Sequence, residues 1–380
     1  IILNICVLMK NKIYKYDFLI VGAGLIGSLA ALALYKNNHK VLIIDKEKYL
    51  PNDRRTLAVN ANSMDFLKNL GIWERLKFKP QPIEKIVIKD YINSSPLIFE
   101  SQTEPMGNVI LNSEMLKITR DKLKKIKILK TDIDINLNSL SPNKVVLINK
   151  NKYSFKKIVI SIGKNNNFNL THKSINFDSG HYSFVGFFNH NKNHDNYAYE
   201  IFNPDGPLAV LPSPSNNKKK STFIYSTKNK ISNSQIKSMI KENFKVTHGL
   251  IKFEKSIFKF PIKPHLRKEN KDFIYIGDSL KSIHPVAGQG WNLGIKDIQK
   301  LILISQNYSL DNSVFNSIYY SNRILESTIY LSFTSFLNFL YENKNPTNSF
   351  IIKAGYSGLL KFKLIKDLFI KQAMGRTNLI

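Results

Sequence analysis

The chain has 380 residues, of which 43% are hydrophobic, a content typical of a folded protein with a sizeable core. Its single cysteine, Cys6, excludes an internal disulfide framework, and its eight histidines show no metal-binding spacing, so we expect no metal site. The formal net charge is +28, which favours an acidic partner, but lysine is spread along the whole chain, as a biased composition would leave it. We find no recognition motif for nucleic acid and expect no such partner.

The N-terminal residues and the apolar stretches indicate where in the cell the protein is expected. Residues 1–8 precede Met9 and have neither the basic leader nor the cleavage site of a signal peptide, so we expect the natural start at Met9. Each apolar stretch is too short or too interrupted to predict a membrane span. We therefore expect a cytoplasmic protein.

The first predicted unit is a strand, a helix and a second strand, which ends in Asp45. Gly22, Gly24 and Gly27 follow the first apolar run in G-x-G-x-x-G spacing, and SLAALALYK continues as a strong helix former. Gly22 allows the tight turn, Gly24 lets a pyrophosphate approach the backbone, and Gly27 lets the helix pack close to the strand. The free N–H groups of the helix start attract phosphate. This unit predicts dinucleotide binding.

The acid at the end of the second strand narrows the choice of dinucleotide. Asp45 stands where a carboxylate accepts hydrogen bonds from ribose hydroxyls. An acid there disfavours a 2′-phosphate, so FAD or NAD fits better than NADP.

Two arginines follow this unit, before a predicted amphipathic helix that ends near Gly71. Arg54 and Arg55 could be solvated side chains at a helix start, or a charge laid against a phosphate or a flavin. Spacing alone favours the solvated interpretation.

Residues 275–298, YIGDSLKSIHPVAGQGWNLGIKDI, form a second notable segment. A buried strand pattern ends at Ile276, Asp278 follows, and a loop rich in glycine leads into a helical pattern.

Several motifs, in chain order, resemble those of the class A flavoprotein aromatic hydroxylases, and most closely the ubiquinone-biosynthesis branch. They are GAGLIG at 22–27, DRRTLAVN at 53–60, GPLAVLP at 206–212, HPVAGQGWNLGIKD at 284–297 and KQAMGR at 371–376. The resemblance therefore covers nearly the whole chain.

The resemblance implies an α/β fold of the p-hydroxybenzoate hydroxylase type. It has a Rossmann-like FAD-binding domain with an inserted antiparallel-sheet substrate domain and a C-terminal helical region. The FAD domain would comprise residues 9–80, 105–170 and 270–310, the substrate domain 81–104 and 171–269, and the helical region 311–380. Strand patterns at KIVIKDY and HYSFVGFFNH fit this division.

The resemblance also implies the site and the reaction. Cofactor contacts are implied for Gly22, Gly24, Gly27, Asp45, Arg55, Asp278, Pro285, Gly288, Gln289, Gly290 and Asn292. In this family reduced FAD takes up O₂ as a C4a-hydroperoxide, whose distal oxygen is attacked by a phenol ring. The flavin carries the chemistry, so no catalytic triad is expected. NAD(P)H is the implied reductant, and the implied substrate is a polyprenylated phenol of ubiquinone biosynthesis.

Two departures from the family pattern concern reduction of the flavin. Ile162 in SIG takes the place of the usual acid of an A-D-G motif, and it can neither accept a hydrogen bond nor carry charge. Lys281 is new in the loop that follows Asp278, where it could pair with a phosphate, with Asp278 or with nothing. These changes leave open a partner-reduced or non-catalytic FAD-binding subunit of a membrane-associated quinone-biosynthesis complex. A prenyl-lipid reductase or a halogenase on the same fold is a further alternative.

The C-terminal segment offers two interpretations. Residues 357–375 place leucines, Ile365 and Phe369 on a broad apolar helix face, with lysines largely opposite. Peripheral contact with the inner face of an anionic membrane and packing on the chain's own domain are about equally expected.

Overall fold

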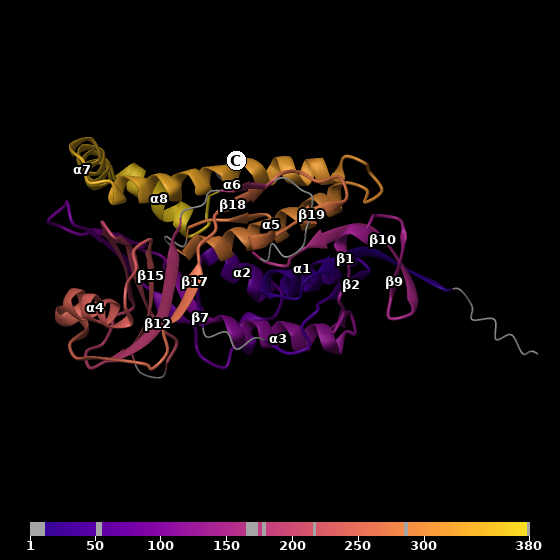
Figure 1. Ribbon diagram of the computed structural model, residues 1–380, viewed down its shortest axis with the longest axis horizontal. Coiled ribbons are helices and arrows are strands. Elements are labelled where there is room, and N and C mark those ends of the chain that lie inside the picture. The colour runs from indigo at the N-terminus through magenta and orange to yellow at the C-terminus, as the bar shows by residue number, and fades with distance from the viewer. Residues whose placement is uncertain are drawn as a thin grey trace, which may run out of the picture.

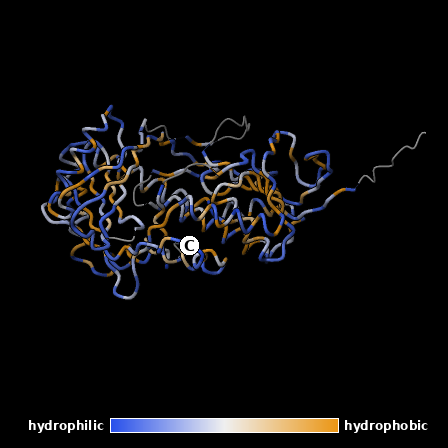
Figure 2. Tube along the Cα trace, turned by 90° about the horizontal axis from the view of Figure 1, so that it is seen from below, coloured by the Kyte–Doolittle hydropathy of each residue, from blue (hydrophilic) through white to orange (hydrophobic). Residues whose placement is uncertain are grey.

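The structure is a computed structural model that describes residues 12–50, 55–164, 174–176, 180–215, 218–284 and 288–377. It combines a parallel sheet, a large mixed sheet, two small sheets and a set of long helices (Figure 1). In Figure 2 the hydrophobic segments gather in the interior, and hydrophilic segments run along the outer loops. No helix among these residues is long and apolar enough to cross a membrane.

The parallel sheet has the strand order β19-β10-β1-β2-β8, with β9 paired to β10. Its strands are β1 Ile13–Val21, β2 Val41–Ile44, β8 Leu129–Lys130, β9 Val145–Ile148, β10 Asn151–Ile160 and β19 Phe273–Tyr275. The central strands are apolar on both faces because both faces are covered. Helices α1 (Leu25–Lys36), α3 (Asn112–Lys125) and α5 (Gln289–Asn307) pack together over one face.

The large mixed sheet has the order β16-β12-β15-β14-β13-β5-β6, with β17 also paired to β12. Its strands are β5 Lys85–Asp90, β6 Leu97–Glu100, β12 Tyr182–His190, β13 Tyr197–Asn203, β14 Gly206–Pro212, β15 Lys220–Thr227, β16 Ile251–Phe253 and β17 Phe258–Pro261. Its described pairings are antiparallel except for β5 with β13, which is parallel. Helix α4 (Asn233–His248) packs on it and begins at a capping box made by Ser232 and Gln235.

Two small sheets lie between these parts of the fold. One has the order β3-β7-β4, and the other β11-β18-β20. The strands are β3 Thr56–Val59, β4 Gln81–Ile83, β7 Gly107–Leu111, β11 Ser174–Asn176, β18 His265–Arg267 and β20 Lys281–Ser282. The short helices are α2 Ala61–Asn69, η1 Trp73–Arg75, η2 Leu137–Ser139 and η3 Gly277–Ser279.

Three helices complete the described chain: α6 (Phe315–Glu342), α7 (Pro346–Lys361) and α8 (Lys363–Ala373). In Figure 1 α6 runs along the upper edge of the molecule, and α7 and α8 lie near its far end. α6 packs on α5, and α8 packs on β6.

The α/β fold class is confirmed, and the expected strand patterns at KIVIKDY and HYSFVGFFNH are β5 and β12. The parallel sheet takes its strands from residues 13–160 and 273–275, whereas the large mixed sheet takes its strands from 85–100 and 182–261. The domain boundaries themselves stay a prediction, because sheet membership does not fix where a domain begins.

Candidate functional site

The carboxyl ends of the parallel sheet bring together segments that are far apart in the sequence. β19, β10, β1 and β2 are neighbours and run parallel, so the segments that follow them share one edge. These segments are the glycine loop 22–27, Asp45, the stretch 161–163 and η3 with Asp278. In open α/β folds this edge is where ligands bind.

The three glycines of the loop between β1 and α1 meet different surroundings. Gly22 has φ +100°, and a Cβ there would lie 2.4 Å from the Ser161 carbonyl oxygen. A Cβ on Gly27 would lie 2.0 Å from the Gly22 carbonyl oxygen. A Cβ on Gly24, in contrast, would meet no described atom within 4 Å. Gly22 and Gly27 therefore fulfil packing requirements, whereas Gly24 faces the open space that a ligand needs.

The start of α1 presents backbone donors to that space. Gly24 is the N-cap, and no side chain caps the helix. The orphan N–H groups of the first turn and the positive end of the helix dipole together suit a pyrophosphate.

Asp45 is fixed by three hydrogen bonds at the end of β2. Its Oδ2 accepts from the Ala23 N–H at 2.6 Å and from Arg120 at 2.8 Å, and its Oδ1 accepts from the Glu47 N–H at 2.7 Å. Arg120 also donates through Nε to the Ala23 carbonyl oxygen at 2.8 Å. The buried pair thus holds the glycine loop through both the N–H and the carbonyl oxygen of Ala23. A carboxylate accepts about four hydrogen bonds, so Asp45 retains capacity for the ribose contact, which stays a prediction.

Arg120 is the functional-site residue that the sequence analysis missed. It lies in α3 among the buried residues Met115, Leu116 and Leu123, and only 4% of its surface is exposed. The sequence did contain a signal for Arg120: a cation on the apolar face of an amphipathic helix needs a buried partner of opposite charge.

The strand β3 is connected to the start of α5 through Asn292. The Asn292 side chain donates to the Ala58 carbonyl oxygen at 3.0 Å and accepts from the Asn60 N–H at 3.1 Å. Asn292 is buried, so its amide holds backbone segments together. The implied contact of Asn292 with the cofactor stays a prediction.

Arg55 precedes β3 and is exposed. Its guanidinium lies 5.4 Å from the ring centroid of Phe260 on β17, which brings the large mixed sheet next to this strand. Arg55 thus lies at the junction of two sheets, and its implied contact with the cofactor stays a prediction.

The second glycine loop leads into α5. Gly288 is its N-cap in the left-handed conformation (φ +60°), and no side chain caps the helix. A Cβ on Gly288 would lie 3.3 Å from the Ala58 Cβ, so the loop passes close to β3. Gln289 and Gly290 are half-buried. Pro285 lies outside the described residues.

Asp278 lies in η3 and is exposed at the carboxyl edge. Its neighbours in η3, Gly277 and Ser279, are buried, so the turn fixes the acid at the surface of the site. This position agrees with the implied cofactor contact, which stays a prediction.

Lys281 has a partner that the sequence analysis did not consider. Its Nζ donates to both carboxylate oxygens of Asp297, at 2.6 and 2.8 Å. Arg323 donates to Asp297 at 2.7 Å, and the Gly277 N–H donates at 2.9 Å. Lys281 therefore connects β20 to α5, and through Asp297 to α6, and its partner is Asp297 rather than Asp278.

This buried network contains more positive than negative charge. Arg323 and Lys296 each contact Glu326 at 2.5 Å, so three cations share two carboxylates. Burial lowers the pKa of Lys281 while Asp297 opposes that effect. For Arg323 the effect of burial is outweighed by Asp297 and Glu326, which raise its pKa. One nitrogen of Arg323, Nη2, has no hydrogen-bond partner among the described residues.

The stretch that departs from the family pattern follows β10. Ser161 is buried against Gly22 and Gly27, and Ile162 packs partly into the cluster beneath the sheet. An apolar side chain thus stands where the resemblance implies an acid.

His284 is buried two residues after β20, and its ring lies edge-on to that of His181, with 5.2 Å between centroids. Neither ring nitrogen of His284 has a hydrogen-bond partner among the described residues. Burial, together with His181, lowers the pKa of His284 to about 3, so the ring is neutral at neutral pH.

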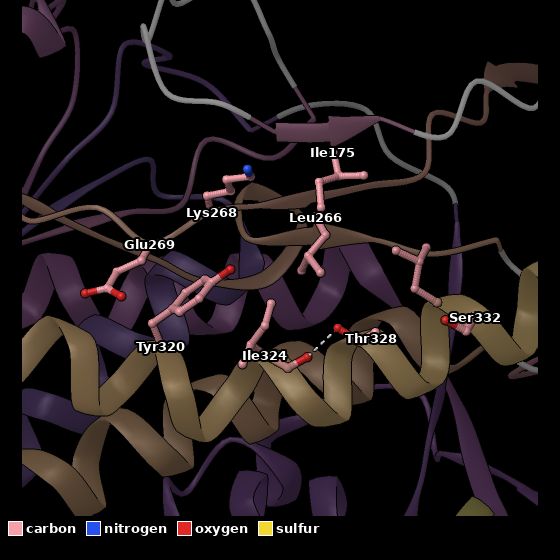
Figure 3. A pocket seen from close by; sticks show the side chains of 9 residues that line it. Ile175, Leu266, Lys268, Glu269, Tyr320, Ile324, Thr328 and Ser332 are labelled. Atoms are coloured by element: carbon pink, nitrogen blue, oxygen red, sulfur yellow. Dashed lines mark hydrogen bonds between the residues drawn. The ribbon is translucent and has the colours of Figure 1, made fainter.

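An apolar groove of about 470 Å³ lies elsewhere, between α6 and the strands β11 and β18 (Figure 3). It is lined by Ile175, Leu266, Lys268, Glu269, Tyr320, Ile324, Thr328, Leu331 and Ser332. The Thr328 hydroxyl donates to the Ile324 carbonyl oxygen of its own helix at 2.8 Å. None of the described site residues lines this groove, so it is separate from the carboxyl edge.

The residues present fit an FAD molecule. The open space at Gly24 provides room, and the uncapped starts of α1 and α5 provide backbone donors. The Asp45–Arg120 pair fixes the first glycine loop, between β1 and α1. The backbone N–H groups at the start of α1 beside Gly24 would hold the pyrophosphate, Asp45 the ribose, and the loop into α5 the flavin ring. Gly22 and Gly27 would serve by letting the loop pack tightly.

Comparison with known proteins agrees with this fit. Residues 15–152 match the family described as FAD binding domain, a segment that contains the glycine loop, Asp45 and Arg120. The ubiquinone hydroxylase UbiL of Rhodospirillum rubrum is 24% identical over 96% of this chain and 90% of its own length. The 3-demethoxyubiquinol 3-hydroxylase of Escherichia coli is 22% identical over 94% and 98%.

Solved structures show the same fold. The p-nitrophenol 4-monooxygenase PnpA from Pseudomonas putida superposes with a TM-score of 0.72 over 95% of this chain and 99% of its own, at 14% identity. CtdE in complex with FAD and a substrate gives a TM-score of 0.70 over 91% and 100%, at 12% identity. The resemblance that the motifs carry is confirmed, and so is the FAD-binding domain.

Proposed function

We propose that the chain is an FAD-dependent monooxygenase that hydroxylates the aromatic ring of a polyprenylated phenol in ubiquinone biosynthesis. The observation that carries this proposal is the meeting of the glycine loop, Asp45, Asp278 and the uncapped start of α5 at one edge of the sheet. The names of the relatives support the pathway.

The flavin, once bound and reduced, would supply O₂ activation: one oxygen atom enters the ring and the other leaves as water, with two electrons from the reductant. The chain's own residues bind and orient. The Asp45–Arg120 pair keeps the glycine loop in the conformation that receives the pyrophosphate. The N–H groups at the start of α5 favour the negative charge of a reduced flavin.

The experiment is turnover by the purified holoprotein with a prenylated phenol, a reductant and O₂. We expect the absorbance of bound oxidised flavin, consumption of O₂ and a product heavier than the substrate by one oxygen atom. A reductase on the same fold would form product without consuming O₂. Protein purified without flavin would contradict the proposal.

A second candidate, a partner-reduced or non-catalytic subunit, is favoured by one observation: the apolar Ile162 stands where the resemblance implies an acid. NADH and NADPH are each mixed with the holoprotein without O₂, and loss of flavin absorbance is timed. Fast loss supports a nicotinamide reductant. If only a chemical reductant bleaches the flavin, and hydroxylation then follows, the electrons come from a partner protein; absence of hydroxylation even then indicates a non-catalytic subunit.

A further inference from the structure

The C-terminal helices expose an unusual number of large apolar side chains. They are Leu325, Ile329, Phe333, Phe336 and Phe339 on α6, Phe350, Ile351 and Leu360 on α7, Phe362 between α7 and α8, and Leu364, Ile365, Leu368 and Phe369 on α8. We call these residues the C-terminal apolar face. Leu364 and Phe350 are 74% and 73% exposed, so nothing in the described chain covers them.

The three helices that carry these side chains pack on one another. The rings of Phe333 on α6 and Phe369 on α8 lie with their centroids 6.4 Å apart, although both are exposed. Gln372 of α8 donates to the Tyr330 hydroxyl of α6 at 2.6 Å. α7 packs on both α6 and α8.

The exposed apolar side chains are not the core-facing side of these helices. α8 buries Ile370, and Met374 follows it into the cluster that contains Phe99 and Ala198, whereas Leu364 and Leu368 point away from that cluster. α7 likewise buries Tyr356. Packing on the chain's own domain and an outward apolar face therefore occur on the same helices, and the sequence had presented them as alternatives.

Lysines surround this face. Lys353, Lys361, Lys363 and Lys371 are exposed, and no carboxylate of the described residues lies within salt-bridge distance of them. Glu342 on α6 is already paired with His181 and Lys228. Asp367 of α8 is half-buried, and among the described residues it forms no salt bridge with Lys363 or Lys371. The sequence Lys361-Phe362-Lys363-Leu364 alternates cation and large apolar side chain at the junction of α7 and α8.

We propose that the C-terminal apolar face docks on an anionic lipid bilayer, with its aromatic and leucine side chains in the acyl boundary and its lysines at the headgroups. Apolar side chains interleaved with unpaired lysines complement an interface that is apolar inside and negatively charged outside. The choice of a bilayer over an acidic protein rests in part on the proposed function, because a polyprenylated substrate resides in the bilayer.

The face is also close to the candidate site. The Met374 carbonyl oxygen accepts from the Asn62 N–H, and Asn60 donates to the Ala373 carbonyl oxygen, so the end of α8 lies against the start of α2. The cluster that buries Ile370 and Met374 of the C-terminal segment also includes Ala58 of β3, and Ala58 lies next to Gly288 of the second glycine loop. A docked protein would hold this loop near the bilayer surface, which shortens the path of a lipid substrate.

Flotation of the full-chain holoprotein with vesicles tests the proposal. Vesicles of phosphatidylcholine alone are compared with vesicles that also contain phosphatidylglycerol, for wild type and for two variants. One variant combines Phe362→Ser, Leu364→Ser and Leu368→Ser, and the other combines Lys361→Glu and Lys363→Glu. We expect wild type to float with the anionic vesicles, and each variant to bind them more weakly by at least about tenfold.

Matched controls come from α4, which carries the same kinds of exposed side chain. One control combines Val246→Ser on α4 with Leu250→Ser just after it, and the other combines Lys241→Glu and Lys245→Glu. They make the same kinds of change away from the C-terminal helices, and the lysine control matches its variant in charge. These controls should float as wild type does. All the variants should keep wild-type melting temperatures, since every substituted side chain is exposed.

Three results would overturn the proposal: wild type that floats with neither vesicle, α4 controls that lose binding equally, or a dimer in size-exclusion chromatography that the serine variant abolishes. The last result would assign the face to a second copy of the chain. Flavin content and turnover of a phenol without a tail should be unchanged in the serine variant. The flotation experiment therefore tests membrane docking independently of whether the proposed hydroxylation occurs.

Discussion

Gly24 and Gly27 belong to one motif, but they are glycine for different reasons. A side chain on Gly27 would collide with the backbone of Gly22, whereas a side chain on Gly24 would enter open space. Gly24 also has extended backbone angles (φ −63°, ψ −177°) that any residue adopts. Only a ligand needs the absence of a side chain at Gly24.

We predict that Gly24→Val abolishes FAD binding and leaves the apoprotein folded. The free energy of unfolding of the apoprotein should fall by no more than about 1 kcal/mol, the scale of losing a favoured N-cap residue, because a Cβ at Gly24 would meet no described atom. Flavin content of the purified variant and urea denaturation measure the two effects. The control, Gly27→Val, should fail to fold because its side chain meets backbone. A Gly24→Val protein with full flavin content would contradict the placement of the pyrophosphate.

The network around Asp297 makes Lys281 and Asp297 unequal partners. Asp297 accepts hydrogen bonds from Lys281, Arg323 and the Gly277 N–H. Its removal leaves the buried Lys281 without a carboxylate and leaves Arg323 with Glu326 alone. Removal of Lys281 leaves Asp297 with two donors.

We predict that Asp297→Ala lowers the free energy of unfolding by about 3–5 kcal/mol, the usual effect of leaving buried charge unpaired. Lys281→Met should lower it by no more than about 2 kcal/mol, since the methionine fills similar space and Asp297 keeps Arg323. Urea denaturation of the single and double variants measures both values and their coupling. Equal losses for the two single variants would show that Lys281 is the essential partner.

At the scale of elements, β12, the loop after it and α4 bring three histidines together at the large mixed sheet. His190 lies 4.5 Å from His248 and 6.0 Å from His194, measured between ring centroids, and all three are buried. Burial lowers the pKa of all three, to about 4 for His194 and about 3 for His248. His248 ends α4, where the helix dipole favours a cation, but burial outweighs that effect.

We predict that the protein loses stability as the pH falls from about 6.5, the ordinary histidine value, towards 4. In that range the unfolded chain binds protons on these histidines and the folded chain does not, so protonation favours unfolding. The variant His248→Leu should reduce the dependence of the free energy of unfolding on pH by up to about 1.4 kcal/mol per pH unit, the value for one proton. Urea denaturation between pH 7 and pH 4 compares variant and wild type. Identical slopes would place a proton on His248 in the folded state.

Asn292 holds the second glycine loop in place by joining two elements of the fold. Its amide connects β3 to α5 over a separation of 232 and 234 residues. The motif marks Asn292 as important, but its role as a tie between backbones depends on where β3 lies.

At the scale of the whole molecule, the proposed FAD site is assembled from three separate stretches of chain. The glycine loop and Asp45, β3, and the segment from η3 to α5 meet only in the folded protein. A ligand that contacts all three should stabilise the whole fold by mass action.

We predict that FAD at a hundred times its dissociation constant raises the free energy of unfolding of the apoprotein by about 2.7 kcal/mol. FMN, which lacks the adenosine and the pyrophosphate bridge, should raise it far less at equal concentration, because the contacts with Gly24 and Asp45 are lost. Thermal denaturation with each ligand measures the shift in melting temperature. Equal shifts would mean that the first glycine loop contributes little to binding.

The sequence by itself determined the features of this protein that depend on neighbouring residues. The strand–loop–helix unit, its glycine spacing and the position of the closing acid follow from a few neighbouring residues, and the motifs add the family and the cofactor. The tertiary structure decided which distant groups meet. It paired Asp45 with Arg120 and Lys281 with Asp297, and it left the outer face of the C-terminal helices uncovered. Local periodicity shows that a helix has an apolar side, whereas the partner of a buried charge depends on packing between elements far apart in the chain.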